Sequence, residues 1–210
     1  MKIKKLGHSC LVIEERDLKI LTDPGSFTDT QNEITRINLI LITHQHRDHL
    51  QIDSVVKVLA NNPNVKIITN TEVGEILDKE QIKYEVIENG GSTIVSGVSI
   101  DGYGNEHYLL PNMVPVQNTG YLIAGKLFYP GDAFYNPNRD IQILALPLGG
   151  PWVKVQEAIN YAKAINPESI FPVHDGMIDS PKDFYKEQTE RFKEVGLKFI
   201  SLSNNEEIEI

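Results

Sequence analysis

The sequence predicts a protein of mixed α and β structure, with two layers of β-sheet and helices on the outside. Three observations support this prediction. Short runs rich in Ile, Leu and Val, bounded by Gly, Pro, Asp or charged residues, dominate residues 2–43 and 84–129 and are typical of strands. Apolar residues with helical spacing follow some of these runs, and strand and helix alternate in the last third. At roughly 100–200 residues per domain, we expect a single domain over residues 1–210.

The individual elements follow from the same patterns, taken in chain order. The expected strands span residues 2–6, 10–14, 19–22, 39–43, 65–69, 84–87, 93–95, 98–103, 120–124, 126–129, 141–146, 169–173 and 198–202. A helix is predicted over 52–60 by apolar residues at positions 52, 55, 56 and 59. A second helix is predicted over 71–79, with Thr71 as its N-cap. Helix 153–165 places its apolar positions 155, 158, 159, 162 and 165 toward the core, and helix 182–194 ends before Gly196.

Composition excludes several classes of function. Twenty basic and 29 acidic residues give a net charge of −9, and a pI of about 5.1 argues against a protein that binds duplex nucleic acid through clustered Lys and Arg. The single cysteine, Cys10, cannot form an internal disulfide. No signal peptide and no run of about 20 apolar residues is present. We therefore expect a soluble, cytoplasmic protein without a membrane partner.

The most informative segment is 39–50, where four potential metal ligands lie within six residues after an apolar strand. His44 and His46 are two residues apart, so in extended backbone both imidazoles point to the same side. Asp48 and His49 follow where the chain turns toward the next helix, and they can reach a second point nearby. Three imidazoles and a carboxylate packed together without a cation would leave buried polar atoms unpaired. The cluster therefore predicts a metal site.

Further candidate ligands follow later strands. His107, Asp132 and His174 each end or follow a strand-like run, so we expect them to converge on one edge of a sheet. Together with the cluster they make five histidines and two aspartates, which are too many for one tetrahedral ion. They suit two ions that share a carboxylate. A site rich in imidazole and free of thiolate fits Zn²⁺, with Mn or Fe as the other possibilities.

The string Thr43-His-Gln-His-Arg-Asp-His49 resembles the HxHxDH signature of the metallo-β-lactamase superfamily. The segments Gly7-His-Ser9, Leu146–Trp152 and Pro172–Gly176 are similar to the prokaryotic branch of L-ascorbate-6-phosphate lactonase-like metal-dependent hydrolases. This resemblance implies an α+β fold, a four-layer αβ/βα sandwich of two mainly antiparallel sheets with outer helices and the site at one sheet edge.

The same resemblance implies a role for each ligand. His44, His46 and His107 would hold the first metal, whereas Asp48, His49 and His174 would hold the second. Asp132 would bridge the two ions. Asp23, which resembles an aspartate on an early strand of the family, would orient a ligand imidazole or the bridging hydroxide.

These residues predict a metal-dependent hydrolase that uses a hydroxide held at a binuclear, zinc-type site. Two cations sharing an oxygen ligand lower the pKa of water toward neutrality. Asp48 and Asp132 are the predicted catalytic carboxylates, which position the nucleophile and move its proton. The expected substrate is a small anionic ester, lactone or phosphoester. The alternatives are a non-heme iron redox enzyme on the same fold, a phosphodiesterase or ribonuclease-type hydrolase, and a non-catalytic metal-binding domain.

Four further residues are candidates for contact with substrate. Asn105 and Tyr135 fall in loops near the ligands. Trp152 lies between Pro151 and a helix start, where it is either an aromatic at the pocket rim or a packing anchor. His8 either bonds across the sheet or faces the pocket. The substrate itself, the native metal and a homo-oligomeric state are left open by the sequence.

Overall fold

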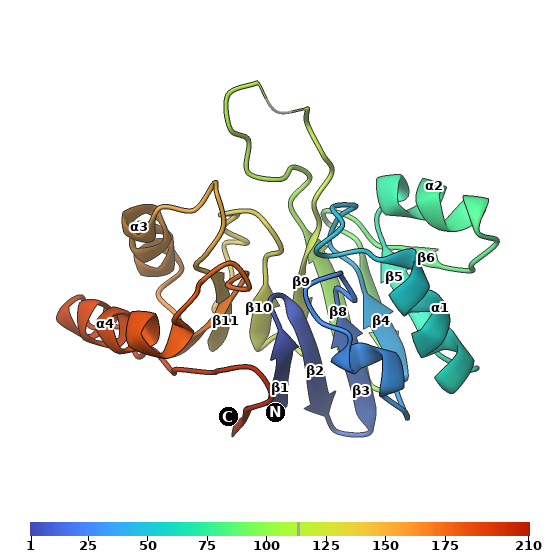
Figure 1. Cartoon of the computed structure of the whole chain (residues 1–210), viewed down its shortest axis with the longest axis horizontal. Coiled ribbons are helices and arrows are strands. Elements are labelled where there is room, and N and C mark those ends of the chain that lie inside the picture. Colours follow the sequence, from blue (N-terminus) through green and yellow to red (C-terminus); the bar gives the residue numbers. More distant parts are fainter. Residues whose placement is uncertain (113) are drawn as a thin grey trace.

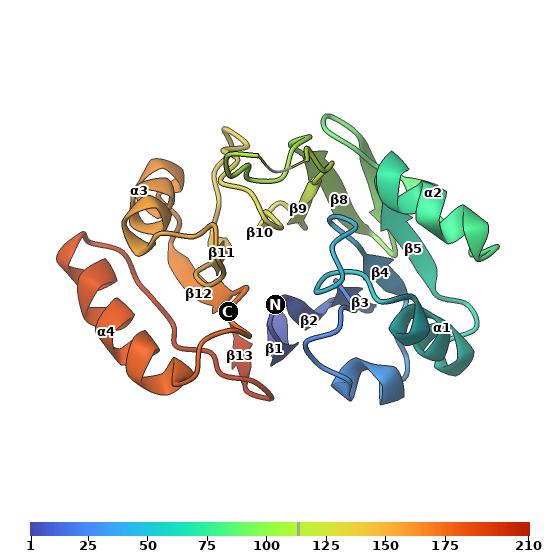
Figure 2. The ribbon, with the colours of Figure 1, turned by 45° about the horizontal axis from the view of Figure 1, so that its top comes forward.

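A computed structural model describes residues 1–112 and 114–210, and it places two β-sheets face to face between two pairs of helices (Figures 1 and 2). In the first sheet the strands run in the order β13-β1-β2-β3-β4-β5-β6, and in the second β12-β11-β10-β9-β8-β7. The first sheet comprises β1 (Lys2–Gly7), β2 (Cys10–Glu15), β3 (Leu18–Thr22), β4 (Leu39–Leu41), β5 (Lys66–Thr69), β6 (Glu85–Val86) and β13 (Glu207–Glu209). The second comprises β7 (Ser92–Val95), β8 (Val98–Tyr103), β9 (Gly120–Ile123), β10 (Leu127–Tyr129), β11 (Ile143–Pro147) and β12 (Ser169–Val173). The helices are η1 (Thr30–Glu33), α1 (Ile52–Asn61), α2 (Thr71–Lys79), α3 (Val155–Ile165) and α4 (Pro181–Glu194).

Three apolar layers hold these elements together, because both faces of each sheet are covered. Along β4, Leu39 and Leu41 face the layer between the sheets, whereas Ile40 faces α1 and α2. Along β11, Ile143 faces the central layer and Leu144 faces α3 and α4. This period-2 alternation of apolar residues with both faces buried confirms the predicted four-layer αβ/βα sandwich.

Both sheets are mixed. Six of the described strand pairings are antiparallel and five are parallel. The antiparallel pairs β1–β2, β2–β3, β7–β8 and β9–β10 are joined by short turns, whereas the parallel pairs β4–β5, β5–β6 and β11–β12 are joined through α1, α2 and α3. This matches the general need of parallel strands for a crossover connection. Parallel strands bring their carboxyl ends to the same edge, which is where the predicted ligands follow.

Three local predictions are corrected by the structure. The N-cap of α2 is Asn70, whose side chain accepts a hydrogen bond from the Val73 N–H, so Thr71 is the first helical residue. In α1, Val56 is 49% exposed, because the helix buries Val55 and Val58 instead. Residues 198–202 form no strand beyond a single bridge between Ile170 and Phe199; Phe199 packs against α4, whereas Ile200 and Leu202 pack in the layer between the sheets.

The chain termini lie together at the far end of the first sheet (Figure 1). The short strand β13, which the sequence analysis did not predict, pairs antiparallel with β1, and the Met1 carbonyl accepts a hydrogen bond from the Ile210 N–H at 2.9 Å. Among the described helices, none is both long and apolar enough to cross a lipid bilayer.

Candidate metal centre

The predicted ligands gather at the edge of the two sheets where several strands end. Asp23 directly follows β3, His174 directly follows β12, and Asp132 lies three residues beyond β10. The turn after β4 carries His44 to His49; it is closed by the Leu50 N–H donating to the His46 carbonyl at 2.8 Å. Two of the residues named above and the neighbouring His8 have left-handed backbone, which is uncommon outside glycine: Asp23 with φ 38°, His174 with φ 57° and His8 with φ 53°.

The structure brings all seven predicted ligands into two adjoining groups. In each group, one nitrogen or oxygen atom per residue lies within 4.8 Å of the others. The first group matches the set implied for the first metal, with the bridging aspartate: His44, His46, His107 and Asp132. The second contains the set implied for the second metal and one addition, His8: His8, Asp48, His49 and His174. The ligand roles of these residues stay a prediction.

Asp132 lies between the two groups. Its Oδ2 is 3.2 Å from Nε2 of His107 in the first group and 2.8 Å from Nε2 of His174 in the second. Its Oδ1 is 3.2 Å from Nε2 of His49. The backbone N–H of Asp132 donates to Oδ1 of Asn118 at 3.0 Å, which fixes the carboxylate at this point. Within residues 1–112 and 114–210, Asp132 is thus the one residue whose carboxylate reaches both groups.

The buried polar atoms at the centre fit divalent cations. Nε2 of His44, Nε2 of His49 and Oδ1 of Asp132 are buried and have no hydrogen-bond partner. Buried polar atoms without a partner are costly and rare, so three of them converging in one place call for a ligand. Imidazole nitrogen and carboxylate oxygen are donors that Zn²⁺, Mn²⁺ and Fe accept. The donor set therefore fits the predicted metal.

Most of the ring nitrogens that face away from the centre are bound to oxygen acceptors. Nδ1 of His49 donates to Asp23 at 2.8 Å, Nδ1 of His107 to the Tyr108 carbonyl at 2.6 Å, and Nδ1 of His174 to the Gly149 carbonyl at 2.8 Å. A neutral imidazole carries one proton, so a proton on Nδ1 leaves the lone pair of Nε2 free. These bonds prepare the three Nε2 atoms to bind a cation.

Asp23 holds the turn as well as the imidazole of His49. Its Oδ1 accepts the backbone N–H of Thr43 at 2.7 Å, and its Oδ2 accepts the hydroxyls of Thr43 at 2.8 Å and Tyr129 at 2.5 Å. The Thr43 hydroxyl in turn accepts from Nδ1 of His44 at 3.0 Å. One fully buried carboxylate therefore links the orientation of two imidazoles.

Burial and neighbouring charges shift the pKa values of several groups of the centre in opposite directions. Burial alone would raise the pKa of Asp132, but the imidazoles of His49 and His174 outweigh it and hold that pKa well below its ordinary value. Burial lowers the pKa of His44 well below the ordinary value. For His174 the carboxylate of Asp132 outweighs burial and raises the pKa to about 9. A cation that binds here must therefore displace protons.

The candidate substrate residues fall into two pairs. Asn105 and Tyr135 line a surface cavity of about 450 Å³ together with His107 and Tyr108. Trp152 and His8 are buried instead. Trp152 is 4% exposed and stacks on Tyr108 at 5.2 Å between ring centroids, and His8 is 1% exposed. That any of these four residues contacts substrate remains a prediction.

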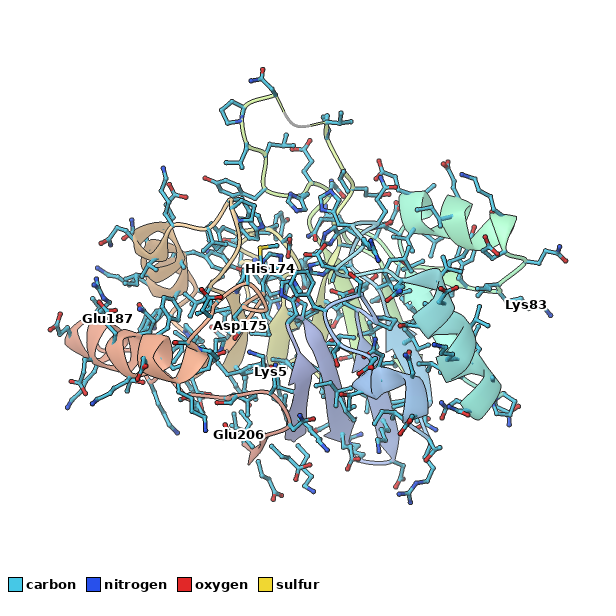
Figure 3. All side chains as sticks on the ribbon, in the orientation of Figure 1. Lys5, Lys83, His174, Asp175, Glu187 and Glu206 are labelled. Carbon is cyan, nitrogen blue, oxygen red and sulfur yellow. The ribbon has the colours of Figure 1, made fainter. Side chains whose placement is uncertain are left out.

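A second buried group behind the centre was not found by sequence reasoning. Nζ of Lys5 on β1 donates to the carboxylate of Asp175, to the Pro172 carbonyl at 3.0 Å and to the Tyr185 hydroxyl at 3.1 Å. Asp175 directly follows His174 in the sequence, and Figure 3 labels Lys5, Asp175 and His174 near one another beside β1. Lys5 follows Lys2 and Lys4 in a basic stretch, and lysines of such a stretch are ordinarily exposed. Its position two residues after Ile3, on the same face of β1, is the one local signal for its burial.

Comparison with known proteins places the chain in a family. Residues 2–174 match the model described as beta-lactamase superfamily domain. Protein Rv0786c of Mycobacterium tuberculosis is 29% identical over 198 residues, covering 90% of this chain and 92% of that protein. The UPF0173 metal-dependent hydrolase NEQ378 of Nanoarchaeum equitans is 26% identical and covers 100% of both chains.

A solved structure shows the same fold. Igni18, a novel metallo hydrolase from the hyperthermophilic archaeon Ignicoccus hospitalis, superimposes with a TM-score of 0.76 at 20% identity, covering 100% of this chain and 98% of that chain. The match to the family model covers most of the chain and includes every predicted ligand. The chain belongs to the beta-lactamase superfamily domain family.

Proposed function

We propose that this protein is a metal-dependent hydrolase that holds two divalent cations, zinc first among them, and cleaves a small anionic ester, lactone or phosphoester. The observation that carries the proposal is the position of Asp132, whose Oδ2 is 3.2 Å from Nε2 of His107 and 2.8 Å from Nε2 of His174. A carboxylate in this position can be shared by both groups of ligands. The names of relatives such as NEQ378 agree with hydrolysis.

The residues that would hold the cations are those of the two groups. His44, His46 and His107 would bind the first and Asp48, His49 and His174 the second, with Asp132 between them. When bound, such a pair of cations lowers the pKa of water toward neutrality, supplies a hydroxide nucleophile and polarises the scissile carbonyl or phosphoryl group.

Asp48 is the carboxylate that can handle the attacking water. Its side chain is 19% exposed, whereas that of Asp132 is 2% exposed. Burial alone would raise the pKa of Asp48, but its hydrogen bonds with His174 and His8 outweigh burial and lower it. The ionised carboxylate can thus accept a hydrogen bond from a water that enters from solvent and orient it. Asp132, more deeply buried, remains in place as the shared ligand.

The anionic character of the substrate is supported by Arg47. This residue is exposed in the turn between His46 and Asp48, and it forms no ion pair with any part of the chain that the structure describes. A guanidinium beside a cationic centre favours a carboxylate or phosphate group on the substrate. The cavity lined by Asn105 and Tyr135 provides about 450 Å³ beside His107 for the rest of a small molecule.

The test is a substrate screen coupled to removal and return of metal. The purified protein is stripped with a chelator, reloaded separately with Zn²⁺, Mn²⁺ and Fe²⁺, and assayed on matched anionic and neutral lactones, carboxylic esters and phosphoesters. Lactones come first because of the resemblance to the lactonase-like branch. We expect hydrolysis that disappears when the metal is removed and returns when it is restored. Asp132→Asn should lose this activity. The exposed Asp140 supplies the control variant Asp140→Asn, which keeps the activity. Full metal occupancy without hydrolysis across the panel would contradict the proposal.

A further inference from the structure

Both ring nitrogens of His8 have a defined partner. Nε2 lies 3.1 Å from Oδ2 of Asp48, and Nδ1 accepts the backbone N–H of Gly176 at 3.0 Å. The residue is 1% exposed, in the turn between β1 and β2. By position alone His8 could be counted as a fourth ligand of the second group, because its nitrogen lies within 4.8 Å of atoms of Asp48, His49 and His174.

The bond to Gly176 decides where the proton of the ring lies. A backbone amide is always a donor, so the nitrogen that receives it must present a lone pair and carry no proton. A neutral imidazole with an unprotonated Nδ1 carries its proton on Nε2. The Nε2 of His8 is therefore a donor to Asp48. His49, His107 and His174 have the opposite arrangement, because their Nδ1 atoms donate to oxygen acceptors.

The ring of His8 is also held in this orientation. It stacks on Phe27 with ring centroids 4.4 Å apart and an interplanar angle of 16°, and its centroid is 4.2 Å from that of His174. The His8 carbonyl accepts the backbone N–H of His174 at 3.2 Å. A ring flip would break the bonds to Gly176 and Asp48 together, so the assignment of the proton does not depend on a mobile side chain.

We propose that His8 is a positioning residue which donates a hydrogen bond from Nε2 to Asp48 and sets the direction of that carboxylate, and that it is not a ligand of the second cation. The inference rests on the two-cation centre of the proposed function. Oδ2 of Asp48 is 3.4 Å from Nε2 of His174, so the bond to His8 holds this oxygen next to a ligand of the second group. Partners of this kind tune a ligand without touching the metal.

Two substitutions separate the roles of the two nitrogens. In His8→Gln, the side-chain amide nitrogen is the same number of bonds from Cα as Nε2 of histidine, so it can still donate to Asp48. In His8→Asn, the shorter amide can still accept from Gly176 but does not reach Asp48, and asparagine tolerates the left-handed φ of 53° at this position. His8→Gln thus keeps the donor to Asp48, and His8→Asn keeps the acceptor for Gly176 but removes that donor.

The first readout is the tautomer of His8, measured by long-range ¹H–¹⁵N correlation spectroscopy on metal-free and zinc-loaded protein. The signals of His8 are those that the His8→Gln spectrum lacks. We expect a proton on Nε2 and none on Nδ1 in both states. A proton on Nδ1, or an Nε2 that loses its proton when zinc binds, would overturn the proposal.

The second readout is a zinc titration against a competing chelator. We expect two equivalents in wild type and in both variants, with the second ion bound about 10–100-fold more weakly in His8→Asn and nearly normally in His8→Gln. Loss of one zinc equivalent in both variants would identify His8 as a ligand and overturn the proposal. A weakening of zinc binding that is equal in the two variants, or no weakening in either, would overturn it as well. The tautomer is measured without metal and without substrate, so a failure of the proposed hydrolysis leaves that test of His8 standing.

Discussion

Nδ1 of His49 lies 2.8 Å from Oδ2 of Asp23, and both side chains are fully buried. The two residues are 26 positions apart, and they meet because β3 and β4 are parallel neighbours. The contact leaves Nε2 of His49 facing Asp132. Burial alone would lower the pKa of His49, but the carboxylates of Asp132 and Asp23 raise it well above its ordinary value.

Replacing Asp23 by Asn should weaken binding of the second cation by about 10–100-fold, because the amide no longer holds the His49 proton on Nδ1. A chelator-competition titration measures the affinity. The exposed turn residue Asp17 supplies the control, and Asp17→Asn should bind metal as wild type does. Equal affinities in the two variants would show that Asp23 does not orient His49.

Removal of metal should lower the unfolding temperature. One ion present at about 1,000 times its Kd contributes about 4 kcal/mol to the free energy of unfolding, which corresponds to a fall of about 8–16 °C for a chain of this size. Calorimetry with and without chelator measures this fall in the unfolding temperature. In Asp132→Asn, the chelator should have little effect. A chelator response in that variant as large as in wild type would place the cations elsewhere.

Lys5→Met should reduce the free energy of unfolding by about 3–5 kcal/mol, because it leaves the Asp175 carboxylate buried without its cation. Adding Asp175→Asn should recover part of the loss, and denaturant unfolding of the single and double variants measures this. The exposed pair of Lys2 and Glu207 is the matched control, with side chains 45% and 44% exposed; Lys2→Met should cost less than about 1 kcal/mol. Strictly additive losses in the double variant would contradict the pairing.

Gly25→Ala should prevent the turn that carries the ligands from closing. A Cβ at Gly25 would lie 1.8 Å from the Asp48 carbonyl oxygen, and that atom belongs to backbone that cannot move without the ligand. A Cβ at Gly90 would meet nothing within 4 Å, and its φ of +82° limits the cost of Gly90→Ala to about 1–2 kcal/mol. Circular dichroism melts and metal titrations compare the two variants. Normal metal binding by Gly25→Ala would refute the turn geometry.

Arg47→Gln should weaken binding of an anionic substrate by a few-fold and leave its neutral analogue unaffected, because an exposed charge at the rim acts through long-range attraction. The dependence of KM on salt concentration, measured for both substrates, should flatten in the variant. An identical salt dependence in wild type and variant would exclude a role for Arg47 in attracting the substrate.

The fold and the centre were predictable to different degrees, and the difference is physical. The cluster from His44 to His49 could be predicted because four metal-ligand types lie within six residues directly after an apolar run. The predicted strand 39–43 ends early, at Leu41, so the turn and not strand alternation sets the direction of these side chains. Helix bounds at α2 and strand bounds at β8 and β12 follow from periodicity. Family resemblance supplied the assignment of the ligands to two ions, which spacing alone leaves open.

What could not be predicted depends on contacts between distant segments. The N-cap of α2 is a local exception: Asn70 and Thr71 are both suitable N-cap residues, and the structure shows that the Asn70 side chain accepts from the Val73 amide. Lys5 lies in a basic stretch that is typical of a surface segment, and the carboxylate that pairs with it inside the protein, Asp175, is 170 positions away. The proton of His8 is fixed by the Gly176 amide, a contact across 168 positions. No local pattern encodes such pairs.

The measurement that tests the central claim most directly is elemental analysis of the purified, extensively dialysed protein beside His46→Gln and Asp132→Asn. We predict two divalent cations per chain in wild type, one in His46→Gln, and fewer than one in Asp132→Asn, because the carboxylate of Asp132 reaches both groups of ligands. A folded wild-type protein that retains no metal after reloading, or an Asp132→Asn variant that keeps both ions, would contradict a shared two-cation centre.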